Sequence, residues 1–125
     1  MKQAIMRPGY TQALPYSHAV VASGRMLYIS GQGPVGLDGK VIEGDFPAQC
    51  RQALANLAAV AEAAGTDLSR AVKVNVYLKD PARDFPTFNE IYRKVFTGDR
   101  PARTTIGCDL PNMLIEVDAI LALDD

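Results

Sequence analysis

The feature that most constrains the fold of this chain is a switch in the spacing of its apolar residues. Between residues 46 and 64 they recur every three or four positions, which is typical of a helix with one buried face. Between residues 71 and 79 they alternate with polar residues, which is typical of a strand with one buried face. A helix that leads directly into a strand predicts a domain that mixes both kinds of structure. The helical stripe consists of Phe46, Cys50, Ala53, Leu54, Leu57, Val60, Ala61 and Ala64.

The other elements follow from similar signals. The first helix has Asp45 as its predicted N-cap, Pro47 in its first turn and Gly65 as its stop. The apolar residues of a second helix, which ends near Gly98, are Phe85, Phe88, Ile91, Tyr92, Val95 and Phe96. Strands are predicted at residues 19–23, 26–31, about 103–109 and 114–123, with Ser23-Gly24 joining the first two. This order predicts one α+β domain over residues 1–125, with a mixed sheet and both helices on one face.

Alternation within the last two strands predicts which residues lie on each face of the sheet. The set that we expect to face the helices in the last strand is Ile115, Val117, Ala119, Leu121 and Leu123. The set that we expect to face away is Leu114, Glu116, Asp118, Ile120 and Ala122. In the preceding strand we assign Ile106 and Cys108 to the helix side, and Arg103, Thr105 and Gly107 to the far side. The far side thus mixes apolar and charged residues, so we expect a subunit contact to cover part of it and leave charged pockets.

Arg103 is the candidate for binding in such a covered site. Its planar guanidinium offers a fork of donors that matches a carboxylate, and partial loss of water strengthens such hydrogen bonds to roughly 1.5–3 kcal/mol each. Glu116 is the candidate general base. Spacing alone favours a second interpretation, in which Arg103 and Glu116 only form a structural ion pair across neighbouring strands.

Charge and composition argue against several other classes. The formal net charge is −1 and no basic run exceeds Arg93-Lys94, which disfavours a nucleic-acid partner. No apolar stretch is long enough for a membrane span and the first residues do not resemble a secretory signal, so we expect a cytoplasmic protein. Cys50 and Cys108 lie far apart and His18 is the only histidine. We therefore expect two buried thiols and no metal site.

Five short segments occur in a fixed order along the chain. They are residues 15–20 (PYSHAV), 29–32 (ISGQ), 49–57 (QCRQALANL), 101–104 (PART) and 115–117 (IEV). Taken together, in register and at the right separations, they resemble the RidA family of reactive-intermediate deaminases, also called YjgF-like or L-PSP endoribonuclease-like proteins. The similarity runs from about Tyr16 to Leu123, nearly the whole chain.

The resemblance implies a chorismate-mutase-like fold that assembles as a homotrimer, with active sites in the clefts between subunits. It implies hydrolysis of enamines and imines such as 2-aminoacrylate and its tautomer to 2-keto acids and ammonia, without a metal or organic cofactor. Arg103 matches the family's carboxylate-binding arginine, and Glu116 matches the glutamate that positions or activates the attacking water. The matched pocket positions are Tyr16, Ser30, Gly31, Asn89 and Thr105.

Three residues depart from the family's pattern. His18 replaces a common glutamine, and we interpret it as a structural hydrogen-bonding residue. Thr105 replaces a frequent cysteine but keeps the backbone carbonyl that a departing amine can use. Asp118 replaces a frequent second glutamate, and we expect it to supply polarity at the subunit contact. Two other functions stay open: a non-catalytic module that binds a small carboxylate and, less favoured by charge, an endoribonuclease or translation inhibitor.

Overall fold

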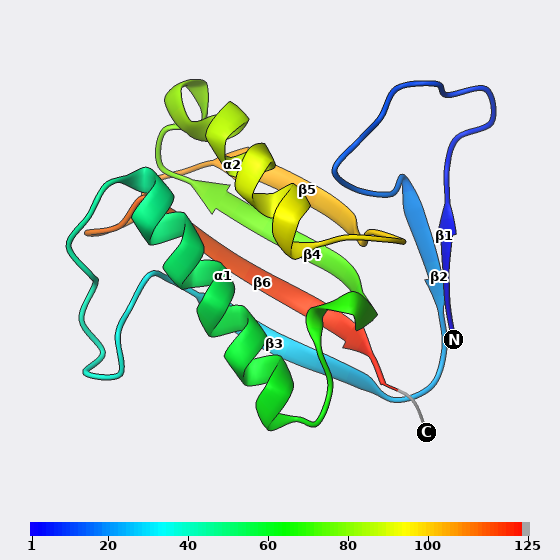
Figure 1. The fold of residues 1–125 in the computed structure, drawn as a ribbon, viewed down its shortest axis with the longest axis horizontal. Helices are drawn as coiled ribbons and strands as arrows, with labels where there is room; N and C mark the ends of the chain where they lie inside the picture. Colours follow the sequence, from blue (N-terminus) through cyan, green and yellow to red (C-terminus); the bar gives the residue numbers. More distant parts are fainter. Residues whose placement is uncertain (124–125) are drawn as a thin grey trace.

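The computed structural model describes residues 1–123, which contain a four-stranded sheet with both helices on one of its faces (Figure 1). The order across this sheet is β3 (Met26–Gln32), β6 (Ile115–Ala122), β4 (Ala71–Leu78) and β5 (Ala102–Gly107). The sheet is mixed, as predicted, because β4 and β5 are parallel while the other neighbours are antiparallel. Helix α1 (Phe46–Ala63) packs on β6 and β3, and α2 (Pro81–Val95) lies beside α1 and over β4.

The helix ends form where local chemistry favours them. The Asp45 carboxylate accepts a hydrogen bond from the Ala48 amide at 3.1 Å, and this satisfies a free donor at the start of α1. Gly65 follows the helix with φ of +80°, a conformation that other residues adopt at a cost. At α2 the Asp80 carboxylate accepts from the Arg83 amide at 3.2 Å. This helix therefore begins before the apolar stripe by which it was predicted.

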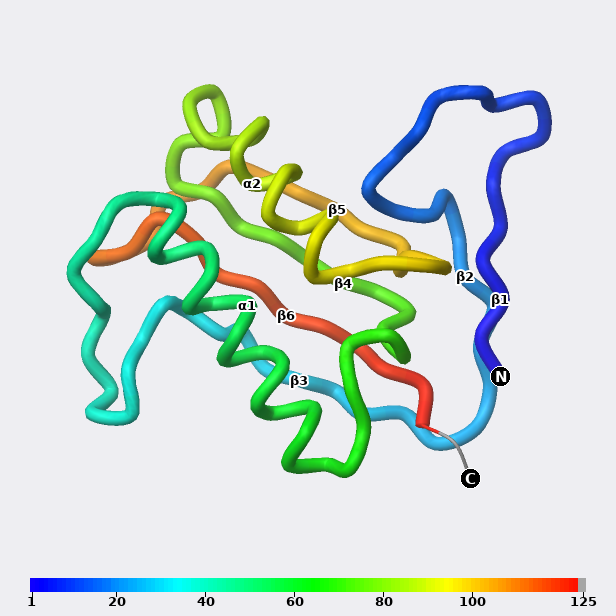
Figure 2. The backbone as a smooth tube through the Cα atoms, viewed as in Figure 1, coloured from blue at the N-terminus to red at the C-terminus, as the bar shows by residue number. Residues whose placement is uncertain are grey.

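The prediction of a single sheet is wrong for the N-terminal part. Strand β2 (Ala19–Ala22) forms a separate two-stranded sheet with β1 (Lys2–Ile5), which was not predicted. Figure 2 shows the chain leaving β1 on a wide excursion before it returns as β2. The end of this excursion is fixed to the start of β5, because the Ser17 amide donates to the Pro101 carbonyl at 3.0 Å and its hydroxyl donates to the Arg100 carbonyl at 2.5 Å.

The core lies between the helices and the sheet, and most of the expected alternation is confirmed. The helix-facing residues of β6, from Ile115 to Leu121 at every second position, are fully or almost fully buried. In β4 the alternation holds from Val74 onward. At its start Ala71 is buried and Val72 is only half-buried, because the register with β6 shifts between Ala71 and Lys73. Such a shift moves side chains to the other face of a strand.

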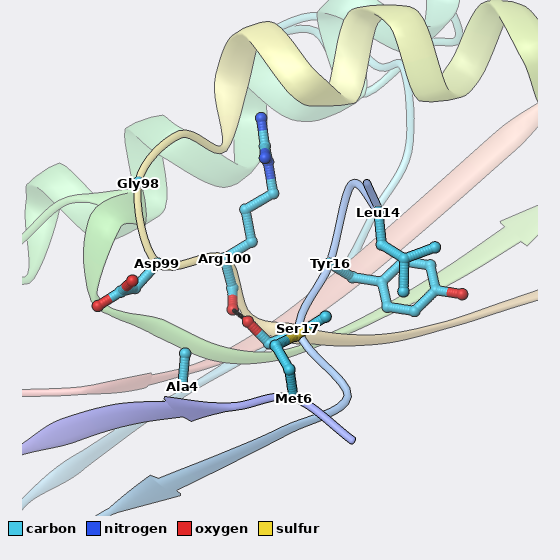
Figure 3. A pocket seen from close by; sticks show the side chains of 8 residues that line it. All are labelled: Ala4, Met6, Leu14, Tyr16, Ser17, Gly98, Asp99 and Arg100. Carbon is cyan, nitrogen blue, oxygen red and sulfur yellow. Dashed lines mark hydrogen bonds between the residues drawn. The ribbon is translucent and has the colours of Figure 1, made fainter. Parts of the chain in front are cut away.

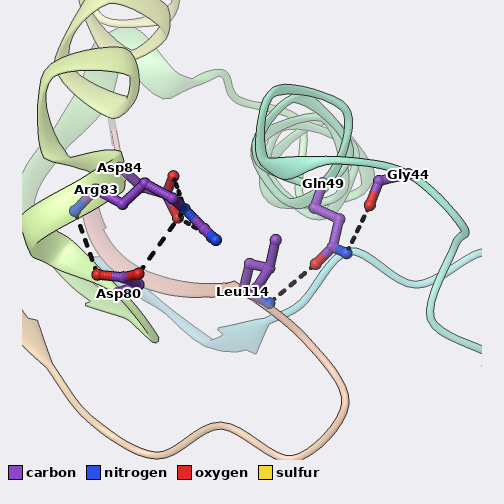
Figure 4. A network of polar contacts seen from close by, with 6 residues as sticks. All are labelled: Gly44, Gln49, Asp80, Arg83, Asp84 and Leu114. Atoms are coloured by element: carbon purple, nitrogen blue, oxygen red, sulfur yellow. Dashed lines mark hydrogen bonds and ion pairs between the residues drawn. The ribbon is translucent and has the colours of Figure 1, made fainter.

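Buried polar side chains near the start of each helix are hydrogen-bonded there (Figure 4). The Gln49 side chain donates to the Gly44 carbonyl at 3.1 Å and accepts from the Leu114 amide at 2.9 Å. It thereby joins the start of α1 to the start of β6. In α2 the buried Asp84 carboxylate accepts two hydrogen bonds from the Arg83 guanidinium, at 2.8 and 2.7 Å. A buried charge without such a partner would be strongly destabilising.

The remaining residues singled out from the sequence have simple environments. Cys50 is fully buried as predicted, and burial raises the pKa of its thiol to about 12. Cys108 is only half-buried, so the expectation of a second buried thiol is wrong. The Nδ1 atom of His18 accepts from the Arg7 amide at 2.8 Å, as expected of a structural hydrogen-bonding residue. Within residues 1–123, no helix is long and apolar enough to cross a bilayer, and no cluster of metal-ligating side chains is present.

Candidate functional site

Arg103 lies on the helix side of the sheet, so its predicted place on the far side is wrong. In the parallel pair of β4 and β5, Val74 is registered with Arg103 and Val76 with Thr105. Registered residues on neighbouring strands share a face, and both valines are fully buried beneath the helices. Ile106, which was predicted to join the core, is instead 46% exposed. Both errors have one origin, since the face of β5 was assigned from its single large apolar residue.

Four aromatic rings surround the guanidinium of Arg103. The distances from its Cζ atom to the ring centroids are 4.7 Å for Tyr92, 5.0 Å for Phe88, 5.0 Å for Tyr16 and 5.8 Å for Phe85. Three of the rings come from one face of α2, and the fourth comes from the segment before β2. Removal of water lowers the pKa of Arg103 from its ordinary value, although an arginine keeps its charge in proteins. The cation is therefore held in a weakly polar environment, where it binds an anion more strongly than in water.

Unpaired polar atoms gather around the same residues. Those that are buried without a hydrogen-bond partner in the described structure include Arg103 Nη1, Asn89 Oδ1, Thr105 Oγ1 and the Tyr92 hydroxyl. Each such group costs about 1–3 kcal/mol, and native proteins keep few of them. Their concentration on α2 and β5 indicates a place where a polar ligand binds. We call Tyr16, Asn89, Arg103 and Thr105 the arginine half.

Glu116 lies on the helix-free face with a different set of predicted residues. It is registered with Tyr77 on β4, and Gly31 packs directly against it. A Cβ atom at Gly31 would lie 2.9 Å from both Cδ and Oε1 of Glu116, so only glycine fits there without displacing the carboxylate. Ser30 and Gly31 are exposed, where the register of β3 against β6 shifts between Ile29 and Gln32. We call Ser30, Gly31 and Glu116 the glutamate half.

The structure therefore divides the seven predicted site residues into two halves. Strand β4 separates β5, which carries Arg103, from β6, which carries Glu116. The two side chains also lie on opposite faces of the sheet, because Arg103 shares a face with Val74 and Glu116 shares one with Tyr77. The interpretation as an ion pair across neighbouring strands is consequently wrong. One copy of the chain does not bring the two residues together.

The helix-free face has the mixed character expected of a covered surface. Tyr28 is 72% exposed and lies opposite Ile120, while Glu116 and Asp118 share the same face. The Asp118 carboxylate accepts from the Asn75 amide group at 3.0 Å and from the Tyr77 hydroxyl at 3.5 Å, and its charge raises the pKa of Tyr77. Polar groups thus bond to one another within the face and leave rings and aliphatic side chains available for contact.

A cavity of about 210 Å³ adjoins Tyr16 (Figure 3). Its lining residues are Ala4, Met6, Leu14, Tyr16, Ser17, Gly98, Asp99 and Arg100. The guanidinium of Arg100 points away from the others and donates to the Phe96 carbonyl at the end of α2, at 2.6 Å. The cavity therefore offers no second free arginine for a carboxylate, and the candidate site remains the surroundings of Arg103.

Sequence reasoning missed the functional side of α2. The sequence indicated Phe85, Phe88 and Tyr92 only as apolar residues of the second helix, and the last two are fully buried. Their spacing of three and four positions also places all three on one face of α2. They can therefore contact a side chain that the neighbouring strand directs toward that face. With the correct face of β5, that side chain is Arg103.

Comparison with known proteins agrees with this fold. The family model described as Endoribonuclease L-PSP matches residues 7–123. A RutC family protein of Pyrococcus horikoshii is 41% identical, over 96% of this chain and 97% of its own. A 2-iminobutanoate/2-iminopropanoate deaminase of Dermatophagoides farinae is 34% identical, over 98% of both chains. A crystal structure of a conserved Rid family protein from Yersinia pestis has a TM-score of 0.87 at 32% identity, over 98% of both chains.

Proposed function

Since this chain belongs to the Endoribonuclease L-PSP family, which includes the RidA or YjgF proteins, we propose that it hydrolyses small imines and enamines to 2-keto acids and ammonia. The observation that carries this proposal is the buried environment of the Arg103 guanidinium. Its Nη1 atom is buried without a partner among aromatic rings, and Asn89 on α2 and Thr105 on the same strand also carry buried oxygens without partners. An unpaired donor fork of this kind is suited to the carboxylate of a 2-imino acid.

In the proposed reaction Arg103 holds the carboxylate and so places the adjacent C=N carbon. Fixing the two reactants in the correct geometry removes much of the entropic part of the barrier. An enamine first takes a proton at carbon to become the iminium, which is a good electrophile. The protein then needs mainly to orient the substrate and to hold a water molecule beside it.

Glu116 is proposed to activate that water. It accepts a proton as the water oxygen bonds to the imine carbon, which gives a carbinolamine. Return of that proton to nitrogen makes the amine a good leaving group. The C–N bond then breaks while the hydroxyl proton passes to the Glu116 carboxylate, which releases ammonia and leaves the keto acid. The overall change is addition of one water and loss of one ammonia, with no oxidant or reductant. The backbone carbonyl of Thr105 is the proposed acceptor for the departing amine.

We further propose that the complete site forms between copies of the chain. The arginine half of one copy and the glutamate half of the next would enclose each substrate, because a single chain holds the halves on opposite faces of its sheet. The mixed helix-free face supplies the contact surface for such an assembly. A closed ring of three copies has three equivalent clefts, in agreement with the homotrimer that the family resemblance implies.

Imine trapping tests the proposed activity. An amino-acid oxidase generates 2-imino acids, and semicarbazide captures those that are not hydrolysed first. Addition of the protein is expected to reduce the yield of semicarbazone, while boiled protein leaves it unchanged. Undiminished trapping across several amino-acid precursors, together with calorimetric binding of 2-keto acids, would instead support a binding module. RNA cleavage that Arg103→Ala abolishes in a nuclease-free preparation would favour the endoribonuclease.

Gly31→Ala tests the role of Glu116 without changing its charge. The added methyl group would meet the Glu116 carboxylate at 2.9 Å, so we expect the carboxylate to move and kcat to fall about tenfold, in the range that misplacing a catalytic group produces. Because the φ of Gly31 is not positive and the added methyl group meets only the flexible end of the Glu116 side chain, the melting temperature should change little. Gly39→Ala, at a position with open space but positive φ, is the control, since it should reduce stability and leave kcat unchanged. An unchanged kcat in Gly31→Ala would contradict the assignment.

A further inference from the structure

We propose that Tyr92 is a positioning residue for Arg103, whose ring fixes the plane of the guanidinium while leaving its hydrogen-bond donors free. The inference rests on the proposed role of Arg103 as the carboxylate anchor. It concerns a residue that the sequence indicated only as an apolar position of the second helix.

The geometry shows why this ring can hold a cation in place. Of the four rings around Arg103, that of Tyr92 is nearest to Cζ, at 4.7 Å. Tyr92 is fully buried, stacks on Phe96 with ring centroids 4.4 Å apart and planes inclined by 25°, and contacts Phe88 at 5.3 Å. Packing on both neighbouring rings therefore restricts the position of this ring. A cation near a packed aromatic face is attracted by the ring's negative potential, and this attraction is strongest where water is excluded.

Two other arginines of this chain, Arg83 and Arg100, are held in a different way. The guanidinium of Arg83 donates to the Asp84 carboxylate, and that of Arg100 donates to the carbonyls of Phe96 and Arg93. Those contacts use the N–H groups of the arginine. A substrate carboxylate needs the same N–H groups on Arg103, so a protein acceptor would compete with it. Aromatic rings instead attract the cation without using its N–H groups, in agreement with the unpaired Nη1 atom.

The inference assigns this role to the ring of Tyr92 and not to its hydroxyl. The hydroxyl is buried and has no partner, so its removal in Tyr92→Phe leaves the support of Arg103 intact. Removal of the whole ring could prevent folding, because Tyr92 lies between Phe88 and Phe96 in the core. A decisive experiment must therefore change the electron density of the ring while preserving its shape.

Fluorinated phenylalanines at position 92 meet this requirement. Phenylalanine and its 4-fluoro, 3,5-difluoro and 3,4,5-trifluoro derivatives have nearly the same shape but a progressively weaker attraction for cations. The measurement is the Kd of 2-oxobutanoate and of its methyl ester, by calorimetry on the assembled protein. We expect Tyr92→Phe to bind the acid within about threefold of the unsubstituted protein, and the trifluoro variant to bind it about tenfold more weakly than Tyr92→Phe. Affinity for the ester should stay constant, as should the melting temperature.

Tyr10 provides the matched control, because the guanidinium of Arg7 lies over its ring at 5.3 Å, outside the candidate site. The same series at Tyr10 should leave both Kd values unchanged. The inference is overturned if the series at position 92 is flat, if acid and ester affinity fall equally, or if the unsubstituted protein binds no 2-oxobutanoate. Because the ligand is a product and not a substrate, a graded series together with undiminished imine trapping would overturn only the proposed deaminase activity.

Discussion

Arg103→Lys is expected to lose nearly as much kcat/KM as Arg103→Ala, by a factor of about one hundred or more. The bidentate fork supplies two charge-assisted hydrogen bonds of roughly 1.5–3 kcal/mol each, and a lysine ammonium reproduces neither their geometry nor their number. A loss of about 3 kcal/mol corresponds to more than a hundredfold in kcat/KM. The surrounding rings add to this effect, because they fit the flat faces of a guanidinium better than a tetrahedral ammonium. Initial rates of imine consumption measure the loss.

Arg7→Lys is the control for this substitution. Arg7 also lies over a tyrosine ring but at an exposed position, so its replacement should leave kcat/KM unchanged. The melting temperature of Arg103→Ala should stay close to that of the parent, since removal of a buried donor without a partner offsets the loss of contacts with the rings. A lysine variant at position 103 with full activity would show that a point charge is sufficient and would remove the proposed role of the fork.

Two inactive variants are expected to regain activity when they are assembled together. Arg103→Ala loses the arginine half and Glu116→Gln loses the glutamate half, so each protein alone should be nearly inactive. If each cleft takes one half from each of two neighbouring copies, random co-assembly at equal amounts gives an intact pair in about a quarter of all clefts, and in about one third of the clefts of mixed rings of three. Co-expression with two different affinity tags, followed by purification through both, isolates the mixed assemblies for kinetic measurement.

The double variant Arg103→Ala/Glu116→Gln supplies the control for this experiment. Mixed assemblies of the double variant with either single variant contain no cleft with both residues, so they should remain inactive. Recovery in the first mixture and not in the second would locate each site between chains. Mixed assemblies of the two single variants that are no more active than their parents would show that the halves do not meet across a contact, and the shared site would have to be abandoned.

The sequence predicted those elements whose apolar face is buried within the same chain. Helix α1 and strands β4 and β6 each place such a face against the core, so their hydrophobic period reports the structure directly. Strand β5 does not follow this rule, because its large apolar residue, Ile106, lies on the surface and Arg103 lies on the helix side. A prediction from the hydrophobic period of one chain assumes that the apolar residues face the core of that chain. A surface suited to contact with a second copy violates this assumption.

The candidate site was only partly predictable. The family resemblance supplied the identities of its seven residues, but their division into two halves depends on the strand order β3-β6-β4-β5, which local patterns do not contain. Strand β1 was missed for a related reason. Its four residues carry no alternating pattern, and the strand exists because β2 provides a pairing edge. Long-range pairing of this kind becomes visible only in the three-dimensional structure.

The placement of complementary binding surfaces on opposite sides of a sheet has a consequence for how copies associate. Two molecules related by a twofold axis contact each other through the same surface patch on both molecules. One patch cannot include the arginine half and the glutamate half together, because these lie on opposite faces of the sheet. Association through the proposed clefts is therefore directional, with each molecule ahead of one neighbour and behind another. Repeated directional contacts either close into a ring or continue as an open fibre. The angle between successive molecules thus determines whether the protein forms a closed ring or a polymer. Substitutions at the edges of the sheet that alter this angle would reduce solubility without changing the fold of each chain.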